Sequence, residues 1–295
     1  MALIDQNDIL ENDLKKTNQL KMIFKRFCRN KMALFGTVVI MLVIFMALFA
    51  PVLAPFRYDE QNLRNTLQPP SSTYIFGTDQ FGRDVFSRVI YGARISLMVG
   101  FGASLLGFIM GGIIGAIAGY FGGVVDNVLM RFVDIILSIP ALMMAISISA
   151  MLGPGLFNAI IAISIGGVGT FSRITRAAVI TVRGNEYIEA AHAIGAGHLR
   201  TIRKHVLPNI AAPLIVQVSL TVAGSIMAGA GLSFIGLGIQ PPIAEWGSML
   251  AAGRSFIRFN WWLSTFPGLA IMVTVYGFNL MGDGLRDALD PRLKN

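Results

Sequence analysis

Long apolar stretches alternate with polar ones along the chain. The apolar stretches cover residues 33–53, 97–120, 135–153, 156–177, 211–236 and 264–282. A run of about twenty apolar residues is long enough to cross the hydrocarbon core of a bilayer as a helix. The pattern therefore predicts an all-α polytopic membrane protein with six transmembrane helices, and Pro140 is expected to kink the third of them.

Composition supports this class and explains the basic charge. Hydrophobic residues make up 54% of the chain and charged residues 14%, and the mean hydropathy is +0.65, which excludes a soluble globular domain as the whole protein. With the N-terminus placed inside, 17 of the 24 Lys and Arg residues fall in inner segments. This asymmetry predicts that both termini are cytoplasmic. Topology thus accounts for the net charge of +8, and no nucleic-acid partner is expected.

The N-terminal segment, residues 1–32, is polar and then basic, with apolar side chains between the charges. The first apolar run is too long for the hydrophobic region of a cleavable signal peptide. We expect the segment to lie as an amphipathic helix on the inner membrane face, with a docking role as the alternative. Cys28 is the only cysteine, so neither an intrachain disulfide nor a thiolate metal cluster is expected.

Glycine recurs at every fourth position through the second apolar stretch and just beyond it. The ladder consists of Gly107, Gly111, Gly115, Gly119 and Gly123. Glycine at this spacing leaves one side of a helix bare, so that another backbone can approach closely. We expect the ladder to pack against a neighbouring helix; the alternative is a sliding surface that repacks as the protein works.

The polar segment between the fourth and fifth spans, within residues 183–210, contains a helix–turn–helix pattern. A short helix is predicted over 186–194, ended by Gly195, which supplies a left-handed turn. A second helix is predicted over 198–206, and Pro208 is expected at the start of the fifth span, where a missing N–H is harmless. All three histidines, His192, His198 and His205, lie in this segment. Their spacing does not favour a metal site on a helix, so none is expected.

The same segment carries a family resemblance. Glu189-Ala190-Ala191, Gly195 and Leu207-Pro208 resemble the "EAA" loop of the membrane subunits of ATP-binding-cassette importers, although the family generally places an aliphatic residue at His205. That loop forms coupling helices that dock on a separate ATPase subunit. The resemblance implies a coupling role for Glu186, Glu189, Ala190, Ala191, Gly195, Arg200, Leu207 and Pro208.

Three other segments narrow the resemblance. The segments Gly77–Arg88 with Tyr91–Arg94, Pro241–Gly247 and Asn279–Pro291 are similar to the C-type membrane subunit of the dipeptide/oligopeptide/nickel importers. In such systems an extracytoplasmic solute-binding protein docks on the outer side, which makes Arg83, Asp84, Arg88 and Arg94 docking candidates. Asp84 and Arg88 also have the spacing of a favourable helical ion pair, and an outer helix held by internal pairs is the alternative.

The resemblance divides the chain into functional segments. Together with the apolar runs and the charge asymmetry, it predicts a cytoplasmic N-terminal segment at 1–32, a first transmembrane helix at 33–53, an extracytoplasmic loop at 54–96, a core permease domain at 97–282 and a cytoplasmic tail at 283–295. Within the core, Trp246, Trp261 and Trp262 are expected to form an interfacial aromatic belt. The charged residues near membrane depth are expected to be paired because unpaired charges there are costly; they are Arg131, Asp134, Arg173, Arg176 and Asp283.

The resemblance also implies partners and a substrate class. It predicts a multi-pass protein of a prokaryotic inner or plasma membrane that forms half of a path for di- or oligopeptides, with a nickel chelate or glutathione as alternative cargo. A homologous second permease subunit, two ATP-binding subunits, the binding protein and membrane lipid are the expected partners. ATP and Mg would bind those ATPase subunits, and this chain is expected to bind no cofactor or metal.

Two other function classes are less consistent with the sequence. The chain has no Gly-x4-Gly-Lys loop to hold a nucleotide phosphate, so it is not expected to be an ATPase or any other enzyme. A secondary transporter driven by an ion gradient is the remoter alternative. Such proteins usually have inverted repeats and charges near the bilayer midplane, and neither is evident here.

Overall fold

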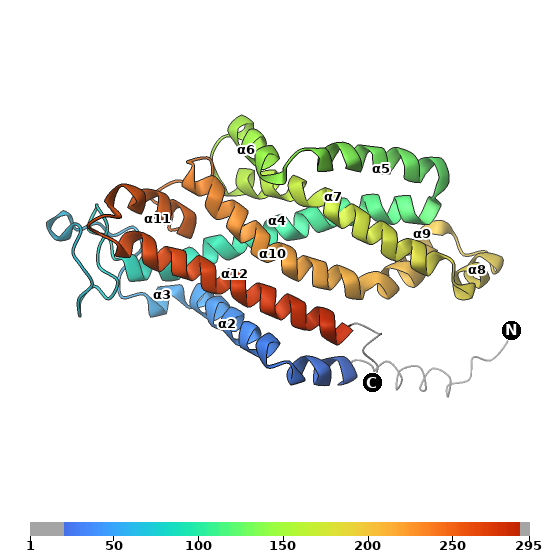
Figure 1. The fold of residues 1–295 in the computed structure, drawn as a ribbon, viewed down its shortest axis with the longest axis horizontal. Coiled ribbons are helices and arrows are strands. Elements are labelled where there is room, and N and C mark those ends of the chain that lie inside the picture. Colours follow the sequence, from blue (N-terminus) through green and yellow to red (C-terminus); the bar gives the residue numbers. More distant parts are fainter. Residues whose placement is uncertain (1–20, 290–295) are drawn as a thin grey trace.

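The computed structural model describes residues 21–289, which form a bundle of long helices without a β-strand in that range (Figure 1). Its α-helices are α2 (Lys31–Leu48), α3 (Ala50–Leu53), α4 (Val85–Phe121), α5 (Gly123–Ser138), α6 (Ala141–Leu152), α7 (Leu156–Arg183), α8 (Glu186–Ala193), α9 (His198–Thr201), α10 (Ala211–Phe234), α11 (Trp246–Gly253) and α12 (Trp262–Leu289). Residues 21–29 are also helical. Most of the N-terminal segment and the end of the predicted tail lie outside the described residues.

The two ends of the bundle carry different structures. Residues 54–84 and α11 lie at one end, and α8 and α9 lie at the other (Figure 1). We call these the outer end and the inner end, after the topology that the charge distribution predicts. Between them, α2, α4, α7, α10 and α12 run lengthwise, and α2 covers only part of the distance between the two ends.

The number of spans agrees with the prediction, but the third is not a simple kinked helix. Five helices, α2, α4, α7, the run from His198 to Phe234, and α12, are long and apolar enough to cross a membrane, and the count is six when α5 and α6, bent by 85° from each other, are taken as one span. The break falls at Ile139, whose backbone is extended (φ −95°, ψ 129°). Because the ring of Pro140 disfavours helical backbone at the preceding residue, the helix must stop there. The predicted bounds 135–153 are therefore wrong.

Helix α4 begins much earlier than the apolar pattern predicted. It starts at Val85 and not at residue 97, so the last part of the predicted outer segment, residues 54–96, is helical. The charges of Arg88 and Arg94 interrupt the apolar run and concealed this part of the helix. At 1.5 Å per residue the 37-residue helix is about 56 Å long, well beyond the roughly 30 Å of a hydrocarbon core. Its outer end therefore belongs to the extramembrane structure.

The glycine ladder packs α4 directly against the backbone of α7, as predicted. Each ladder glycine faces one carbonyl of α7: Gly107 faces Ser164, Gly111 faces Val168, Gly115 faces Ser172 and Gly119 faces Arg176. A Cβ added at Gly111 would lie 2.5 Å from the carbonyl oxygen of Val168. That is too close for any real side chain, so glycine is required for this approach. A sliding role stays a prediction.

Gly123 is not part of the ladder, and its inclusion was wrong. It follows the end of α4, it has a positive φ of 54°, and a Cβ there would meet no atom within 4 Å. It opens the turn from α4 into α5 because its backbone conformation is one that other residues resist. Its position four residues after the last ladder glycine is a coincidence, because α4 has already ended.

We predict that Gly111→Ala destabilises the protein whereas Gly112→Ala does not. The added methyl at Gly111 would collide with the backbone of α7, and overpacking of this kind costs about 1–3 kcal/mol. At Gly112 its nearest neighbour would be the Phe108 ring at 3.6 Å, an ordinary contact. Thermal unfolding of the purified variants measures the difference, and equal melting temperatures would contradict the packing described here.

Candidate functional sites at the two ends of the bundle

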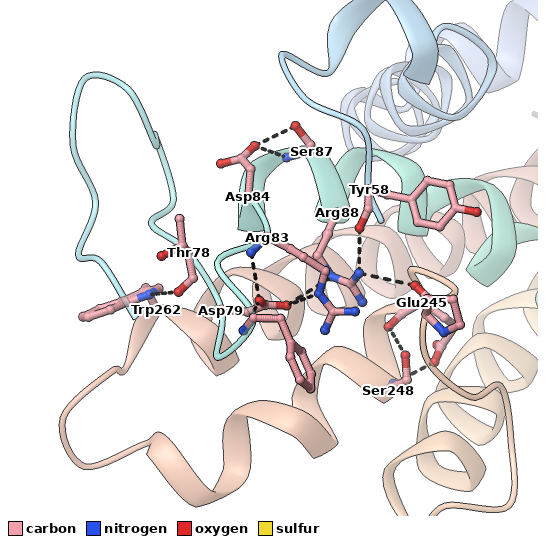
Figure 2. Close-up of polar contacts among 12 residues, drawn as sticks. Tyr58, Thr78, Asp79, Arg83, Asp84, Ser87, Arg88, Glu245, Ser248 and Trp262 are labelled. Atoms are coloured by element: carbon pink, nitrogen blue, oxygen red, sulfur yellow. Dashed lines mark hydrogen bonds and ion pairs between the residues drawn. The ribbon is translucent and has the colours of Figure 1, made fainter. Parts of the chain in front are cut away.

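At the outer end, a buried ionic cluster holds the polypeptide before α4 (Figure 2). Asp79 is at its centre: one carboxylate oxygen accepts the Arg83 Nε–H at 2.7 Å. The other oxygen accepts the backbone N–H groups of Phe81 at 2.9 Å and of Arg83 at 3.0 Å. Both side chains of this pair are almost fully buried. The short segment 79–83 is thereby closed into a turn before the helix starts.

Arg88 joins this turn to two other parts of the chain. Its Nε lies 3.8 Å from the Asp79 carboxylate. Its Nη1–H groups donate to the carbonyl of Tyr58 at 2.7 Å and to that of Pro242 at 3.3 Å. One buried guanidinium thus connects the segment after α3, the N-terminal turn of α4 and the loop before α11. The five donors of arginine in a fixed fork suit it to this role.

Asp84 does not pair with Arg88, so the predicted ion pair is wrong. Its Oδ2 caps α4 by accepting the backbone N–H of Ser87 at 2.7 Å and the Ser87 hydroxyl at 2.6 Å. Burial raises the pKa of the Asp84 carboxyl above its ordinary value. The Asp84 carboxylate therefore caps the helix and does not form the side-chain ion pair that the i, i+4 spacing predicted.

Glu245 caps α11 in the same way, and this role was not predicted from the sequence. Its two carboxylate oxygens accept the backbone N–H groups of Gly247 and Ser248, each at 2.8 Å. Burial raises the pKa of this carboxyl. An acidic residue directly before a short helix is a capping pattern, so the signal was present in the sequence.

The outer cluster changes the assignment of the predicted docking residues. Arg83, Asp84 and Arg88 are each at most 4% exposed, so in this conformation they hold the fold together and offer no docking surface. Arg94 is exposed. Internal pairing, the alternative interpretation, therefore applies to Arg83 and Arg88, which pair with Asp79, whereas Asp84 caps α4.

The tryptophans do not form the predicted aromatic belt. Trp246 is fully buried, Trp262 is 5% exposed, and only Trp261 is largely exposed. The Trp246 indole donates to the carbonyl of Val89 at 2.9 Å, and the Trp262 indole donates to that of Thr78 at 3.3 Å. Trp246 therefore joins α11 to α4, and Trp262 joins α12 to the outer segment, so both rings serve the interior of the fold.

At the inner end, α8 is anchored on one face and open on the other. Ile188 and Ala191 are buried, and Ile188 belongs to the same apolar cluster as Tyr120 and Val206. Of the predicted coupling residues, Glu186, Glu189, Ala190, Gly195, Arg200, Leu207 and Pro208 are exposed and Ala191 is buried. The loop therefore presents its carboxylates and small side chains on a base that is packed against the bundle.

Gly195 makes the turn that the sequence predicted. Its φ is 83°, a left-handed conformation, and the N–H of Ala196 donates to the carbonyl of Ala191 at 3.0 Å. This bond closes a helix C-cap of the Schellman type. On either side of the turn, Ile194 is 86% exposed and Leu199 is 80% exposed. This apolar tip was not identified from the sequence because single apolar residues in a polar loop carry little signal.

Pro208 lies within a helical run and does not begin a separate span. The chain passes from α9 through a π-helical turn (Ile202–Val206) and a 3₁₀ turn (Leu207–Ile210) into α10. Within that run, the Leu207 N–H donates to the carbonyl of Ile202, five residues back. A proline removes one N–H and displaces the carbonyl four residues earlier, which accounts for the irregular turns around it. The loop therefore continues into the membrane helix without a non-helical break.

Charges near the inner ends of the helices are paired, as predicted for three of them. Arg176 makes a two-pronged pair with Asp126, both contacts at 2.5 Å. Arg173 donates to Asp134 at 2.7 Å. For Arg131 and Asp283 the structure gives no ion pair within residues 21–289. These pairs hold α7 against α5.

In residues 21–289 no group of three His, Cys, Asp or Glu side chains is placed to hold a metal ion. His198 instead contacts α4, with its Nδ1 lying 3.1 Å from the Tyr120 hydroxyl. This contact ties the second half of the loop to the inner end of α4.

Comparison with known families assigns the chain. Residues 111–295 match the family model described as binding-protein-dependent transport system inner membrane component. Residues 18–70 match the N-terminal transmembrane domain of oligopeptide transport permease C. The chain belongs to this family of inner membrane components. It is thus a permease subunit of an ABC importer and is not itself the catalytic subunit.

Relatives of this permease subunit are peptide permeases by name. It is 48% identical to the dipeptide transport system permease protein DppC of Alkalihalophilus pseudofirmus, over 92% of this chain and 90% of the relative. It is 46% identical to the di/tripeptide permease protein DppC of Pseudomonas aeruginosa over 94% and 93% of the two chains. Identity to the oligopeptide permease protein OppC of Bacillus subtilis is 42% over 99% and 96%.

A solved structure confirms the fold of the permease subunit. A chain of the inward-facing MetNI methionine ABC transporter superposes with a TM-score of 0.56 at 20% identity, covering 70% of this chain and 98% of that one. At that identity the likeness shows the fold alone. The subunit therefore has the membrane-domain fold of a type I ABC importer.

We predict that Asp79→Asn destabilises the protein strongly while Asp59→Asn does not. Losing the carboxylate leaves buried Arg83 and Arg88 without their anionic partner, a loss that typically costs about 3–5 kcal/mol. Asp59 pairs with Arg57 at the surface, where such pairs contribute about 0–1 kcal/mol. Thermal unfolding and limited proteolysis within residues 57–84 compare the two; similar behaviour would contradict a structural role for the cluster.

Proposed function

We propose that the chain forms half of the translocation path of an ATP-driven importer for di- or oligopeptides. A homologous permease subunit completes the path, two ATPase subunits bind ATP and Mg on the cytoplasmic side, and an extracytoplasmic binding protein delivers the peptide. Both termini are cytoplasmic in this assignment. Peptide is the proposed cargo because the relatives named above are dipeptide, di/tripeptide and oligopeptide permeases.

The observation that carries the proposal is the construction of the inner loop. Its base is buried through Ile188 and Ala191, while its tip exposes Ile194 and Leu199 beside the carboxylates of Glu186 and Glu189. Large exposed apolar side chains next to charges are typical of a protein interface. The tip lies outside the membrane span, so a soluble subunit is the partner that fits it.

Movement of the loop can be transmitted to the membrane helices because the connections are short and helical. The helical run from α9 continues without a break into α10, and α8 follows α7 after a two-residue turn. When the ATPase subunits close on ATP, a displacement of the loop would therefore tilt α7 and α10 together. Rigid-body rocking of this kind exchanges inward-open and outward-open states.

We predict that Gly195→Val weakens coupling while Gly197→Val does not. A Cβ added at either glycine would meet no atom within 4 Å, so neither change causes a clash. Gly195 has a φ of 83°, and valine in that conformation costs at least about 1–2 kcal/mol, which would reshape the tip. Gly197 has an ordinary φ of −67° and serves as the matched control.

The readouts for this pair are co-purification of the ATPase subunits and peptide uptake. Gly195→Val should lower both at normal membrane insertion, and Gly197→Val should resemble the wild type. Normal peptide uptake by the Gly195→Val variant would contradict the proposed coupling role of this loop.

The transport proposal is tested in proteoliposomes that contain the complete complex. We expect uptake of a labelled dipeptide to require both the binding protein and ATP, and to persist when ion gradients are collapsed. Excess unlabelled dipeptide should compete, whereas glutathione and a nickel chelate should not. Uptake that follows an ion gradient without ATP would instead indicate a secondary transporter.

A further inference from the structure

A groove at the outer end surrounds the one predicted docking residue that remains exposed. It has a volume of about 370 Å³ and is lined by Tyr58, Tyr91, Arg94, Ile95, Met98, Ile243 and Ala244. Within residues 21–289 the guanidinium of Arg94 makes no hydrogen bond or ion pair with another side chain or carbonyl. A cation lined by aromatic and aliphatic side chains is suited to an anion that carries apolar groups.

The walls of the groove are held in place by the buried cluster described above. The Tyr58 carbonyl accepts a hydrogen bond from Arg88 at 2.7 Å, and its ring extends away from the buried arginines (Figure 2). The Tyr58 and Tyr91 rings lie 5.1 Å apart. Asp59, the acid next to Tyr58, is paired with Arg57 and does not neutralise Arg94. The site is therefore preformed and positive.

Beyond the groove, in the direction of its inner end, α4 has an exposed apolar stripe. Met98, Phe101 and Leu105 follow Arg94 at helical spacing and are 51%, 43% and 53% exposed. They occupy one face of the helix, one to three turns further into the membrane. On the side that faces the inner end of α4, the groove therefore continues into an apolar surface that lipid acyl chains can cover.

The position of Arg94 along α4 matches the depth of lipid headgroups. The inner end of the helix is marked by Gly119 and Tyr120, whose carbonyls accept hydrogen bonds from Arg183. A hydrocarbon core of about 30 Å spans roughly twenty residues of an upright helix at 1.5 Å each. It would end near residue 99, which puts Arg94 about 8 Å beyond the core. Phosphate groups lie in this layer, where tyrosines are also enriched.

We propose that this groove is a binding site for an anionic phospholipid of the outer leaflet, with Arg94 holding the headgroup phosphate. Arginine forms charge-assisted, two-pronged hydrogen bonds to phosphate. Tyr58 and Tyr91 flank the headgroup, and the acyl chains lie along Met98, Phe101 and Leu105. A carboxylate of a docked binding protein would pair with Arg94 but could not cover the apolar stripe within the membrane. The proposal does not depend on which peptide the importer carries.

The site is tested with the importer complex purified through a tag on this chain. The complex is reconstituted in nanodiscs of equal parts phosphatidylcholine and phosphatidylglycerol, and native mass spectrometry then counts retained phosphatidylglycerol. We expect Arg94→Ala to lower occupancy of one tightly held lipid at least about fivefold, in line with the strength of charge-assisted hydrogen bonds. Arg94→Lys should retain part of it because lysine keeps the charge but not the fork.

Arg64→Ala is the matched control, since it removes an exposed positive charge from the same outer segment but outside the groove. Equal phosphatidylglycerol retention by the Arg94→Ala and Arg64→Ala variants would overturn the proposal. A second measurement separates lipid from protein contacts: binding-protein-stimulated ATPase activity in nanodiscs of phosphatidylcholine alone. We expect Arg94→Ala to leave that stimulation unchanged. Its loss there would assign Arg94 to docking of the binding protein and would likewise overturn the lipid site.

Discussion

The contact between the backbones of α4 and α7 is the constraint on which the rest of the structure depends. Two helix backbones can approach each other this closely only where the side chains between them are absent or very small. The four ladder glycines of α4 permit this, each against a carbonyl of α7. The outer end of α4 carries Asp84 and Arg88, its inner end contacts the loop through Tyr120, and α7 leads directly into α8. The closest helix pair thus links both functional ends.

Charge is used differently at the two ends. At the outer end the charged side chains are buried: Asp79, Arg83 and Arg88 hydrogen-bond to one another and to backbone groups of the chain. They therefore determine the shape of the outer surface but are not part of it. At the inner end, Glu186 and Glu189 remain exposed on a helix whose opposite face is packed. Buried ion pairs are costly to break, which suits a fixed platform. Exposed carboxylates cost little and remain available to a partner.

Part of the fold and of the site could be predicted because the signals are local. Apolar runs of sufficient length and the glycine at 195 each act through the backbone within a few residues and have the predicted effect, whereas the proline at 140 breaks the helix instead of kinking it. The N-terminal extension of α4 was missed because Arg88 lowers the local hydropathy, although its charge is balanced by Asp79 in the preceding turn and by carbonyls of residues 58 and 242. Asp84 was misassigned because capping and ion pairing use the same i, i+3 and i, i+4 spacings.

By itself, the sequence determined the class of protein, the number of spans, the glycine face of α4 and the turn at Gly195, because these follow from hydropathy and backbone conformation along a single segment. Only the tertiary structure decided that α5 and α6 meet at 85°, that three of four candidate docking residues are interior, and that Arg94 lies exposed in a groove. Those outcomes depend on which distant groups satisfy each buried polar atom. Spacing along the chain does not encode such pairings, since Arg88 finds its partners thirty and more than one hundred and fifty residues away.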